Sequence, residues 1–399
     1  MQLELSLVLC RQRRGDCDGC PITSNTMILT QCAVCATELG LSLGKKCGRC
    51  STRYCGPECQ VQHWKEGGHD KLCKSIKKAG GAEQYNANKR YTEALAVAVE
   101  ACADDTKGQT CYICTQALHW KTKEGLVRGC ACRGTAGLAH VSCLAEQAKI
   151  LVAEAVENNL GAKAFDERWA RWYECSLCEQ RYHSVVSCAL GWACWKTYVG
   201  RPEIDPFNLR MNAMQRLECG LSAAGKHGER VGILEAKLAI EVRLGTLEEA
   251  VLNTKNNMAH CYDQLGRTQE ALELRREIYA SSADVIDATH RFVFAMNLAI
   301  SYIETGRVRD AKSFLRKQLP EALRALGSED RIYIKFRWTY AQALFLNDRA
   351  SRDDVVESIA IHEELAATAR RVLGPAYPLT TSIQDTFAQA RERLASFDK

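Results

Sequence analysis

The sequence lacks an apolar stretch long enough to cross a membrane. A spanning helix needs about 20 predominantly apolar residues. The longest candidate, residues 185–199, is shorter than that and is interrupted by Lys196. The first ten residues, MQLELSLVLC, contain Glu4 and form too short an apolar run for a secretory signal peptide. We therefore expect no membrane partner and no secretion.

The sequence also lacks a strong charge of one sign and the motifs of common enzymes. Its net charge is +5 and its pI is about 8.3, which is too weakly basic to indicate nucleic acid as a partner. It contains no glycine-rich phosphate loop, no pair of catalytic carboxylates and no nucleophile–base pattern. The composition is that of a globular protein, and it leaves open whether the protein is an enzyme.

Cysteine, in contrast, is abundant, with 22 residues in a chain of 399. In a secreted protein this number would indicate a disulfide framework. Here the paired spacings favour zinc ligands, and with them a reducing compartment, the cytoplasm or the nucleus. Two sets of eight positions have such spacings. The first set is Cys32, Cys35, Cys47, Cys50, Cys55, Cys59, His69 and Cys73, and the second is Cys111, Cys114, Cys130, Cys132, His140, Cys143, Cys175 and Cys178.

Each set of eight predicts two zinc sites, because a structural zinc ion takes four ligands in a tetrahedron. Thiolates are soft ligands that suit zinc, and a C-x2-C turn lets two sulfurs grip the same ion. We therefore expect four Zn²⁺ ions as cofactors. Structural sites of this kind leave the metal no open position for chemistry, so we expect no catalytic residues around them.

The residues CAVC…CGRCSTRYCGPECQVQHWKEGGHDKLC, from Cys32 to Cys73, resemble a MYND zinc finger. The resemblance implies interleaved ligands. One zinc would take Cys32, Cys35, Cys55 and Cys59, and the other would take Cys47, Cys50, His69 and Cys73. Nine residues separate Cys59 from His69, more than is usual in the family, and Gly67-Gly68 forms the insertion. A flexible loop absorbs such an insertion at little entropic cost.

The same resemblance implies a role for this module in binding short peptides, often ones that contain proline. It also implies that His63 is not a zinc ligand. We expect Trp64 to pack against a small helix rather than to form a ligand platform.

The second set resembles the RING-CH, or RING-variant, domain, with C-x2-C, fifteen residues, C-x-C, seven residues, H-x2-C and a final C-x2-C. The resemblance implies one zinc on Cys111, Cys114, His140 and Cys143 and another on Cys130, Cys132, Cys175 and Cys178. Such domains commonly act as ubiquitin ligases that position a charged conjugating enzyme. Ile113 matches the apolar docking residue of the family. Two features depart from the family pattern: Gln147 replaces a frequent tryptophan, and 31 residues separate Cys143 from Cys175.

The cysteines outside both sets have simpler interpretations. Cys188 and Cys194 lie in an apolar stretch with two tryptophans, and we expect them to be buried core residues. Cys17 and Cys20 are compatible with a redox pair, with ligands of a third site or with plain thiols, and the last interpretation is favoured.

The C-terminal half repeats. NNMAHCYDQLGRTQEAL begins at Asn256 and AMNLAISYIETGRVRDAK at Ala295, and four identical residues recur 40 positions apart. This period is typical of stacked helical hairpins in which a glycine ends the first helix. The segment resembles tetratricopeptide (TPR) repeats of the kinesin-light-chain kind. The residues that carry the resemblance are Leu-Gly at Leu244, Leu326 and Leu373, the Asn-x-Ala-x3-Tyr cores at Asn257 and Asn297, and Gly-Arg at Gly266 and Gly306.

The predicted fold class is mainly α, with two small zinc-stabilised cross-brace modules followed by a TPR-like solenoid. The predicted segments are an irregular lead-in (1–25), a MYND-type finger (26–80), a connecting helix (81–107), a RING-CH-like zinc domain (108–200) and helical repeats (206–399).

The predicted function is a zinc-binding interaction adaptor whose partners are proteins or short peptides, bound through the MYND-type finger and the solenoid. The alternative is a RING-CH-type ubiquitin ligase, with a ubiquitin-conjugating enzyme as partner and the solenoid as its substrate-recognition domain. Nucleic acid is a distant third.

Overall fold

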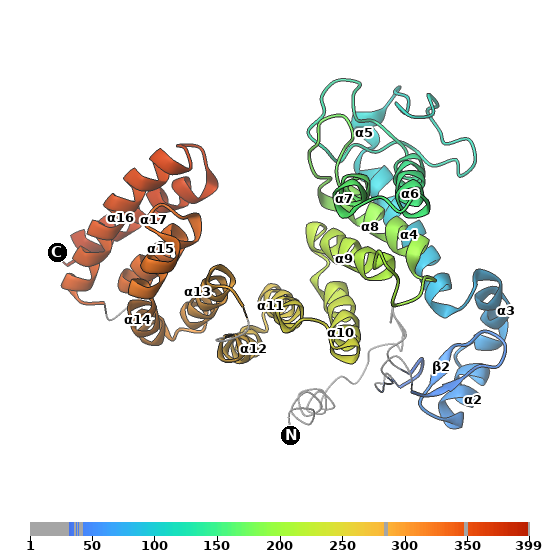
Figure 1. Cartoon of the computed structure of the whole chain (residues 1–399), viewed down its shortest axis with the longest axis horizontal. Coiled ribbons are helices and arrows are strands. Elements are labelled where there is room, and N and C mark those ends of the chain that lie inside the picture. Colours follow the sequence, from blue (N-terminus) through green and yellow to red (C-terminus); the bar gives the residue numbers. More distant parts are fainter. Residues whose placement is uncertain are drawn as a thin grey trace. The chain divides into compact units, whose positions relative to one another are not determined.

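The computed structural model describes residues 32–35, 37, 39, 43–282, 286–346 and 350–397 (Figure 1). The predictions for residues 1–25 lie outside this part of the chain. The described part is mainly helical, and the chain divides into two compact units between Arg90 and Tyr91. No helix in the described part of the chain is long and apolar enough to cross a membrane.

The first unit contains a two-stranded sheet and two short helices, α2 (Pro57–Lys65) and α3 (His69–Ala79). Strand β1 (Lys45–Lys46) pairs antiparallel with β2 (Arg53–Tyr54). Tyr54 is fully buried among the cysteines, which lie on the loops around the sheet and on the two helices. This small core places the turns that carry the first eight predicted ligands.

The predicted connecting helix is present and crosses the boundary between the two units. It is α4 (Ala82–Ala101), and the short α5 (Ala103–Thr106) follows it directly. Loops with little regular structure come next. They lead to helices α6 (Val141–Glu157), α7 (Ala162–Trp169), η2 (Ala170–Trp172) and α8 (Ser184–Tyr198).

The long gap between Cys143 and Cys175 is filled by packed structure. It contains most of α6, all of α7 and the 3-10 turn η2, and α6 packs against all three of α7, η2 and α8. Phe165 and Trp169 from α7 stack with ring centroids 5.8 Å apart, and Trp169 also lies 5.5 Å from the ring of Tyr198 on α8. The insertion therefore brings its own aromatic core.

Helix α8 is buried on nearly all sides, as its uniformly apolar sequence requires. Cys188 and Cys194 are 2% and 0% exposed, and Trp192 and Trp195 are equally buried. The prediction that the two cysteines are core residues is confirmed.

Helix α8 packs against α9 (Leu209–Ala223), the first helix of the solenoid, more extensively than any other two helices of the described part (Figure 1). Two glycines allow this contact. A Cβ atom on Gly220 would lie 2.6 Å from the carbonyl oxygen of Ser187, and one on Gly191 would lie 3.0 Å from that of Arg216. The two backbones therefore approach more closely than side chains permit, which joins the second cysteine-rich module to the repeats.

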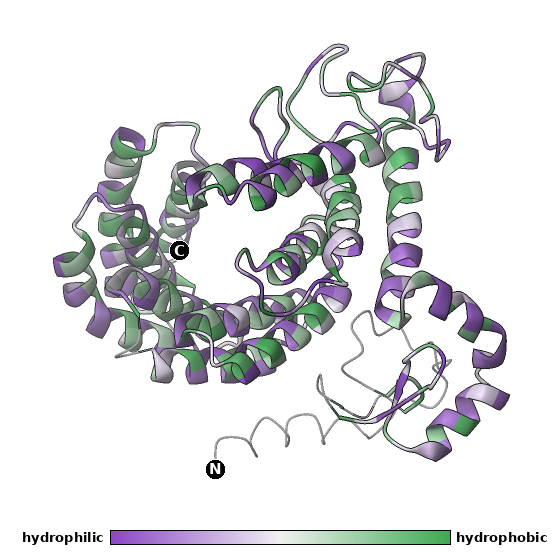
Figure 2. Cartoon of the chain, turned by 45° about the vertical axis from the view of Figure 1, so that its right-hand side comes forward, coloured by the Kyte–Doolittle hydropathy of each residue, from purple (hydrophilic) through white to green (hydrophobic). Residues whose placement is uncertain are grey.

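The solenoid consists of successive antiparallel helices. After α9 these are α10 (His227–Leu244), α11 (Glu248–Gln264), α12 (Thr268–Ser281), α13 (Ala288–Glu304), α14 (Val308–Leu326), α15 (Arg331–Phe345), α16 (Arg352–Val372) and α17 (Pro378–Ala395). Each helix packs on the next, and α13, α15 and α17 also pack side by side in one layer. Figure 2 shows apolar and polar residues alternating along these helices, as expected of elements with one buried face.

The repeated glycines end helices as predicted. Gly266 and Gly306 both have a φ of +74°, directly after α11 and α13. In each case the N–H of the residue after the glycine donates a hydrogen bond to a carbonyl near the end of the helix. Arg267 donates to Tyr262 at 2.8 Å, and Arg307 donates to Tyr302 at 2.7 Å. This is the hydrogen bond of a Schellman cap, which favours glycine at the left-handed position.

We expect Gly220→Ala to lower the free energy of unfolding by about 1–3 kcal/mol, because the added methyl group overlaps the backbone of α8. Gly232→Ala is the control, since a Cβ atom there meets no atom within 4 Å. That change should leave stability equal or raise it by up to about 1 kcal/mol through helix propensity. Thermal and denaturant unfolding of both variants measures the difference. Equal stability of the two would contradict the close contact between α8 and α9.

Candidate metal centres

The first cysteine-rich module brings its eight predicted ligands together as two interleaved groups. One group is Cys32, Cys35, Cys55 and Cys59, and the other is Cys47, Cys50, His69 and Cys73. Within each group all ligand atoms lie within 4.8 Å of one another. The ligands of the first group come from the turn at Cys32 and from the start of α2, and those of the second from the turn at Cys47 and from α3.

The second module repeats this arrangement. Its groups are Cys111, Cys114, His140 and Cys143, and Cys130, Cys132, Cys175 and Cys178, again with all ligand atoms within 4.8 Å of one another. Cys143 lies in the first turn of α6, and Cys175 follows the α7–η2 insertion. After the insertion, the chain therefore comes back to the tetrad that also contains Cys130 and Cys132.

The distances between ligand atoms fit zinc. A tetrahedral ion with Zn–S bonds of about 2.3 Å separates its sulfurs by about 3.8 Å. The sulfurs of Cys47 and Cys73 are 3.8 Å apart, and so are those of Cys132 and Cys175. In the first group, the Cys55 sulfur lies 3.5 Å from that of Cys35. Four thiolate sulfurs, or three with one imidazole nitrogen, form a closed coordination shell at this spacing, so the four tetrads fit four structural zinc ions.

Three of the C-x2-C turns share one backbone conformation. The residue after the second cysteine, Ser51, Thr115 or Glu179, has a positive φ of 61°, 61° or 55°. The N–H of this residue donates to the carbonyl of the first cysteine at 2.8–2.9 Å, as Thr115 does to Cys111. None of the three is a glycine, so the sequence carries no sign of the left-handed position. The tertiary fold around each tetrad imposes it.

Both histidines lie in surroundings that favour the neutral imidazole, the form that binds a metal. Burial lowers the pKa of His69 and of His140, which favours the unprotonated ring that binds zinc. His69 directs Nε2 to its group, 3.3 Å from the sulfur of Cys50. His140 directs Nδ1, 3.4 Å from the sulfur of Cys114, and its Nε2 lies 3.3 Å from the carbonyl oxygen of Ala117. That backbone contact orients the His140 ring.

A buried carboxylate supports the tetrad of Cys111, Cys114, His140 and Cys143. Glu124 is 8% exposed and accepts hydrogen bonds from the backbone N–H and the hydroxyl of Ser142, both at 2.7 Å. Ser142 lies in the first turn of α6, beside the ligand Cys143, so Glu124 caps the helix that carries a zinc ligand. Tyr91 of α4 also contacts the Ser142 hydroxyl, at 3.1 Å. Sequence reasoning missed Glu124, because its partner lies 18 residues away.

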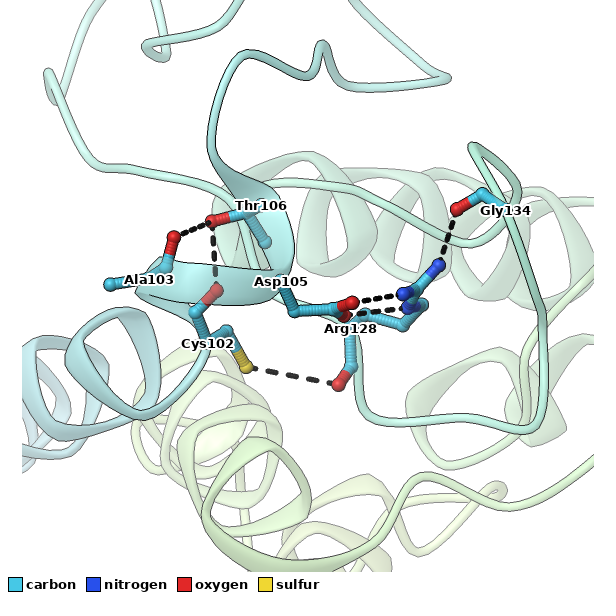
Figure 3. A network of polar contacts seen from close by, with 6 residues as sticks. All are labelled: Cys102, Ala103, Asp105, Thr106, Arg128 and Gly134. Carbon is cyan, nitrogen blue, oxygen red and sulfur yellow. Dashed lines mark hydrogen bonds and ion pairs between the residues drawn. The ribbon is translucent and has the colours of Figure 1, made fainter.

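A second polar network, shown in Figure 3, links the residues after α4 to Arg128 and Gly134. The guanidinium group of Arg128 binds both carboxylate oxygens of Asp105 on α5 and donates to the carbonyl of Gly134 at 2.5 Å. The Cys102 sulfur lies 3.7 Å from the Arg128 carbonyl oxygen. Gly134 follows the ligand Cys132 by two residues in the same loop. Arg128 therefore connects the connecting helix to this ligand loop.

His63 and Trp64 lie outside the tetrads. The Nδ1 atom of His63 is 3.0 Å from the Tyr54 hydroxyl, which gives this histidine a structural partner. Trp64 packs on the ring of His69 with centroids 5.8 Å apart, but it remains 42% exposed and α2 has no buried residue. Trp64 therefore packs as expected over part of its ring, and the rest of the ring faces solvent.

Comparison with known families agrees with this geometry. Residues 32–73 match the MYND finger. Residues 111–157 match the RING-variant domain. The second match ends before Cys175 and Cys178, and the structure groups this pair with Cys130 and Cys132, as the sequence analysis predicted. Together the two matches cover less than half of the chain. A search of curated proteins returns no match.

Two similar solved structures are crystal structures of a kinesin light chain with nearly identical TPR-like repeats from Podosopora anserina. One is a variant with a single substitution. It is 21% identical, covers 58% of this chain and 97% of its own, and has a TM-score of 0.39. The other has the same identity and coverage and a TM-score of 0.38.

We expect the purified protein to contain four zinc ions per chain, as measured by elemental analysis. Cys73→Ser should leave two, because the first module depends on both of its interleaved sites for folding. Cys219→Ser is the matched control, since this exposed thiol belongs to no tetrad and its loss should leave all four ions in place. Two or fewer ions in the unmodified protein would contradict one of the modules.

Proposed function

We propose that the protein is a zinc-dependent interaction adaptor of the cytoplasm or the nucleus. In this proposal the MYND finger binds peptide segments and the TPR-like solenoid binds further protein partners. The zinc sites support this role because all four have closed tetrads, which organise a surface instead of presenting a reactive metal. Reduced thiols persist in these compartments, which suits sixteen positions that bind metal through cysteine and histidine.

The observation that carries the proposal is the exposure of three large apolar side chains on the two helices of the MYND finger. Val61 and Trp64 on α2 and Leu72 on α3 are 50%, 42% and 41% exposed. Each of the two helices carries ligands of a different tetrad, Cys59 on α2 and His69 with Cys73 on α3, and none of the three apolar residues is a ligand. A partly exposed tryptophan with aliphatic neighbours is the usual anchor of a small interface. This surface suits a short peptide with apolar residues.

We expect Trp64→Ala to weaken peptide binding at least about tenfold, since truncating an aromatic anchor costs about 2 kcal/mol or more. Peptides selected from a displayed library by the full zinc-loaded chain provide the ligands, and calorimetry or anisotropy gives the affinities. Leu247→Ala is the matched control, because Leu247 is 81% exposed and lies in the solenoid. Selected peptides that bind the Trp64 variant as well as the unmodified protein would count against the proposed surface.

A second function, ubiquitin ligation, is supported by a different contact. The Tyr112 hydroxyl lies 3.1 Å from the Ser176 hydroxyl, which joins the first and the last C-x2-C turns of the RING-variant domain. Ile113 and Leu177 follow these two residues on the same two turns; Ile113 is half-buried and Leu177 is 52% exposed. Two aliphatic residues on adjacent zinc turns suit a shallow docking site for a conjugating enzyme.

An autoubiquitination assay with a panel of conjugating enzymes tests this second function. If the protein is a ligase, Ile113→Ala with Leu177→Ala should reduce ubiquitin transfer at least about tenfold, and Cys130→Ser should abolish it. Leu118→Ala is the control, because Leu118 is 57% exposed but lies outside the two turns. Transfer that depends on Cys130 would overturn the adaptor-only view, whereas no transfer with any enzyme would reject the ligase.

A further inference from the structure

One face of helix α14 carries a row of basic side chains, Arg309, Lys312, Arg316 and Lys317. Their spacing of three, four and one residues places them along one side of the helix. Together with Ser313 they line an open hollow in the surface. We call these four basic residues the α14 basic row.

Most of this positive charge is available to a ligand. Arg309, Arg316 and Lys317 are exposed, and no carboxylate of the described residues lies within salt-bridge distance of their charged groups. Lys312 is half-buried and pairs with Asp354 at the start of α16. The row is therefore neutralised at one position and open at the other three.

The acidic residues of α14 itself do not offset the row, because both have other partners. Asp310 accepts a hydrogen bond from Arg307 at 2.6 Å, and Glu321 pairs with Arg291 of α13 at 3.3 Å. The remaining basic residue of the helix, Arg324, donates to the carbonyl of Pro320. The helix thus carries five basic and two acidic residues, and the unpaired charge is on one face.

The length of the row selects the kind of anion. Arg309 and Lys317 are eight residues apart, which spans about 12 Å of helix. An extended peptide covers this distance with about four residues, and its alternate side chains are spaced about 6.6 Å apart. Side chains one helical turn apart, about four residues, are separated by about 6 Å along the helix, which is similar to the spacing of the alternate peptide side chains. A single phosphate group would contact only one or two of these cations, whereas a run of carboxylates would contact all of them.

We propose that the α14 basic row is a docking surface for an acidic peptide segment of a partner protein, bound in extended form along the helix. The guanidinium groups of Arg309 and Arg316 favour carboxylates, with which they form paired hydrogen bonds. The aliphatic stems of the four side chains provide apolar contact beneath the charges. The proposal rests on the adaptor function in one respect only, that the solenoid is a partner-binding part of the chain.

The test is fluorescence anisotropy of the full zinc-loaded protein with a labelled peptide that contains a run of about six glutamates. Arg316→Glu combined with Lys317→Glu should weaken binding about tenfold or more, and added salt should weaken binding to the unmodified protein. Ser313→Glu, which places one negative charge inside the row, should also weaken it. A peptide with glutamine in place of glutamate should not bind.

The matched control is Lys77→Glu with Lys78→Glu, which reverses the same charge on residues of α3. It should leave peptide affinity within about twofold of the unmodified protein. An equal loss in the two double variants would overturn the proposal, because it would show attraction by net charge alone. Tighter binding of single-stranded RNA than of the acidic peptide at the same salt would also overturn it, in favour of a nucleic acid.

Circular dichroism and melting of each variant separate lost binding from lost folding. If the charge-reversed double variant does not fold, Arg316→Gln with Lys317→Gln removes the charges without adding repulsion, and unchanged affinity in that variant would reject the site. Failure here, together with retained Trp64-dependent peptide binding, would reject the α14 basic row and leave the adaptor function in place.

Discussion

Closure of four tetrahedral Cys/His sites is the interaction on which the N-terminal half of this protein depends. Among the described residues, the buried core of the MYND finger consists of Cys32, Ala33, Leu39, Cys47, Cys50, Tyr54, Cys73, Ile76 and Ala82, and the four cysteines in it are zinc ligands. Such a core buries too little apolar surface to offset the entropy of ordering its loops. Zinc supplies the missing free energy, on the order of 10 kcal/mol per site in peptide models.

The two zinc modules relate differently to the rest of the chain. The MYND finger belongs to its own compact unit, and the division from the second unit falls inside α4. The RING-variant domain is continuous with the solenoid, because α8 packs on α9 through Gly191 and Gly220. Closely packed protein interiors transmit strain from one element to the next. Loss of zinc from the second module should therefore reach the first repeat, whereas loss from the first module should remain local.

The surfaces that the fold leaves exposed differ in chemistry. The MYND finger presents aliphatic and aromatic side chains on α2 and α3, and the RING-variant turns present Ile113 and Leu177. The α14 basic row presents unpaired cations on a solenoid helix. An adaptor with apolar and cationic surfaces on different parts of one chain can distinguish partners by sequence chemistry as well as by shape.

The sequence by itself determined the four tetrads, the helical class and the repeats. The C-x2-C spacing lets two sulfurs of one turn bind the same ion, and a 40-residue period with small residues and a terminal glycine constrains each helical hairpin locally. Gly266 and Gly306, for example, took the left-handed conformation that their positions predicted. Family resemblance supplied how the pairs interleave, which spacing alone leaves open.

The tertiary structure decided what depends on distant contacts. Ser51, Thr115 and Glu179 adopt a left-handed backbone that their residue types do not favour, and Glu124 caps α6 across 18 residues. The close contact between α8 and α9, the exposure of Trp64 and the open charges of the α14 basic row all result from which faces the packing covers. Local spacing determines which side chains share a turn, but burial and charge pairing are set by neighbours that the chain meets only after it folds.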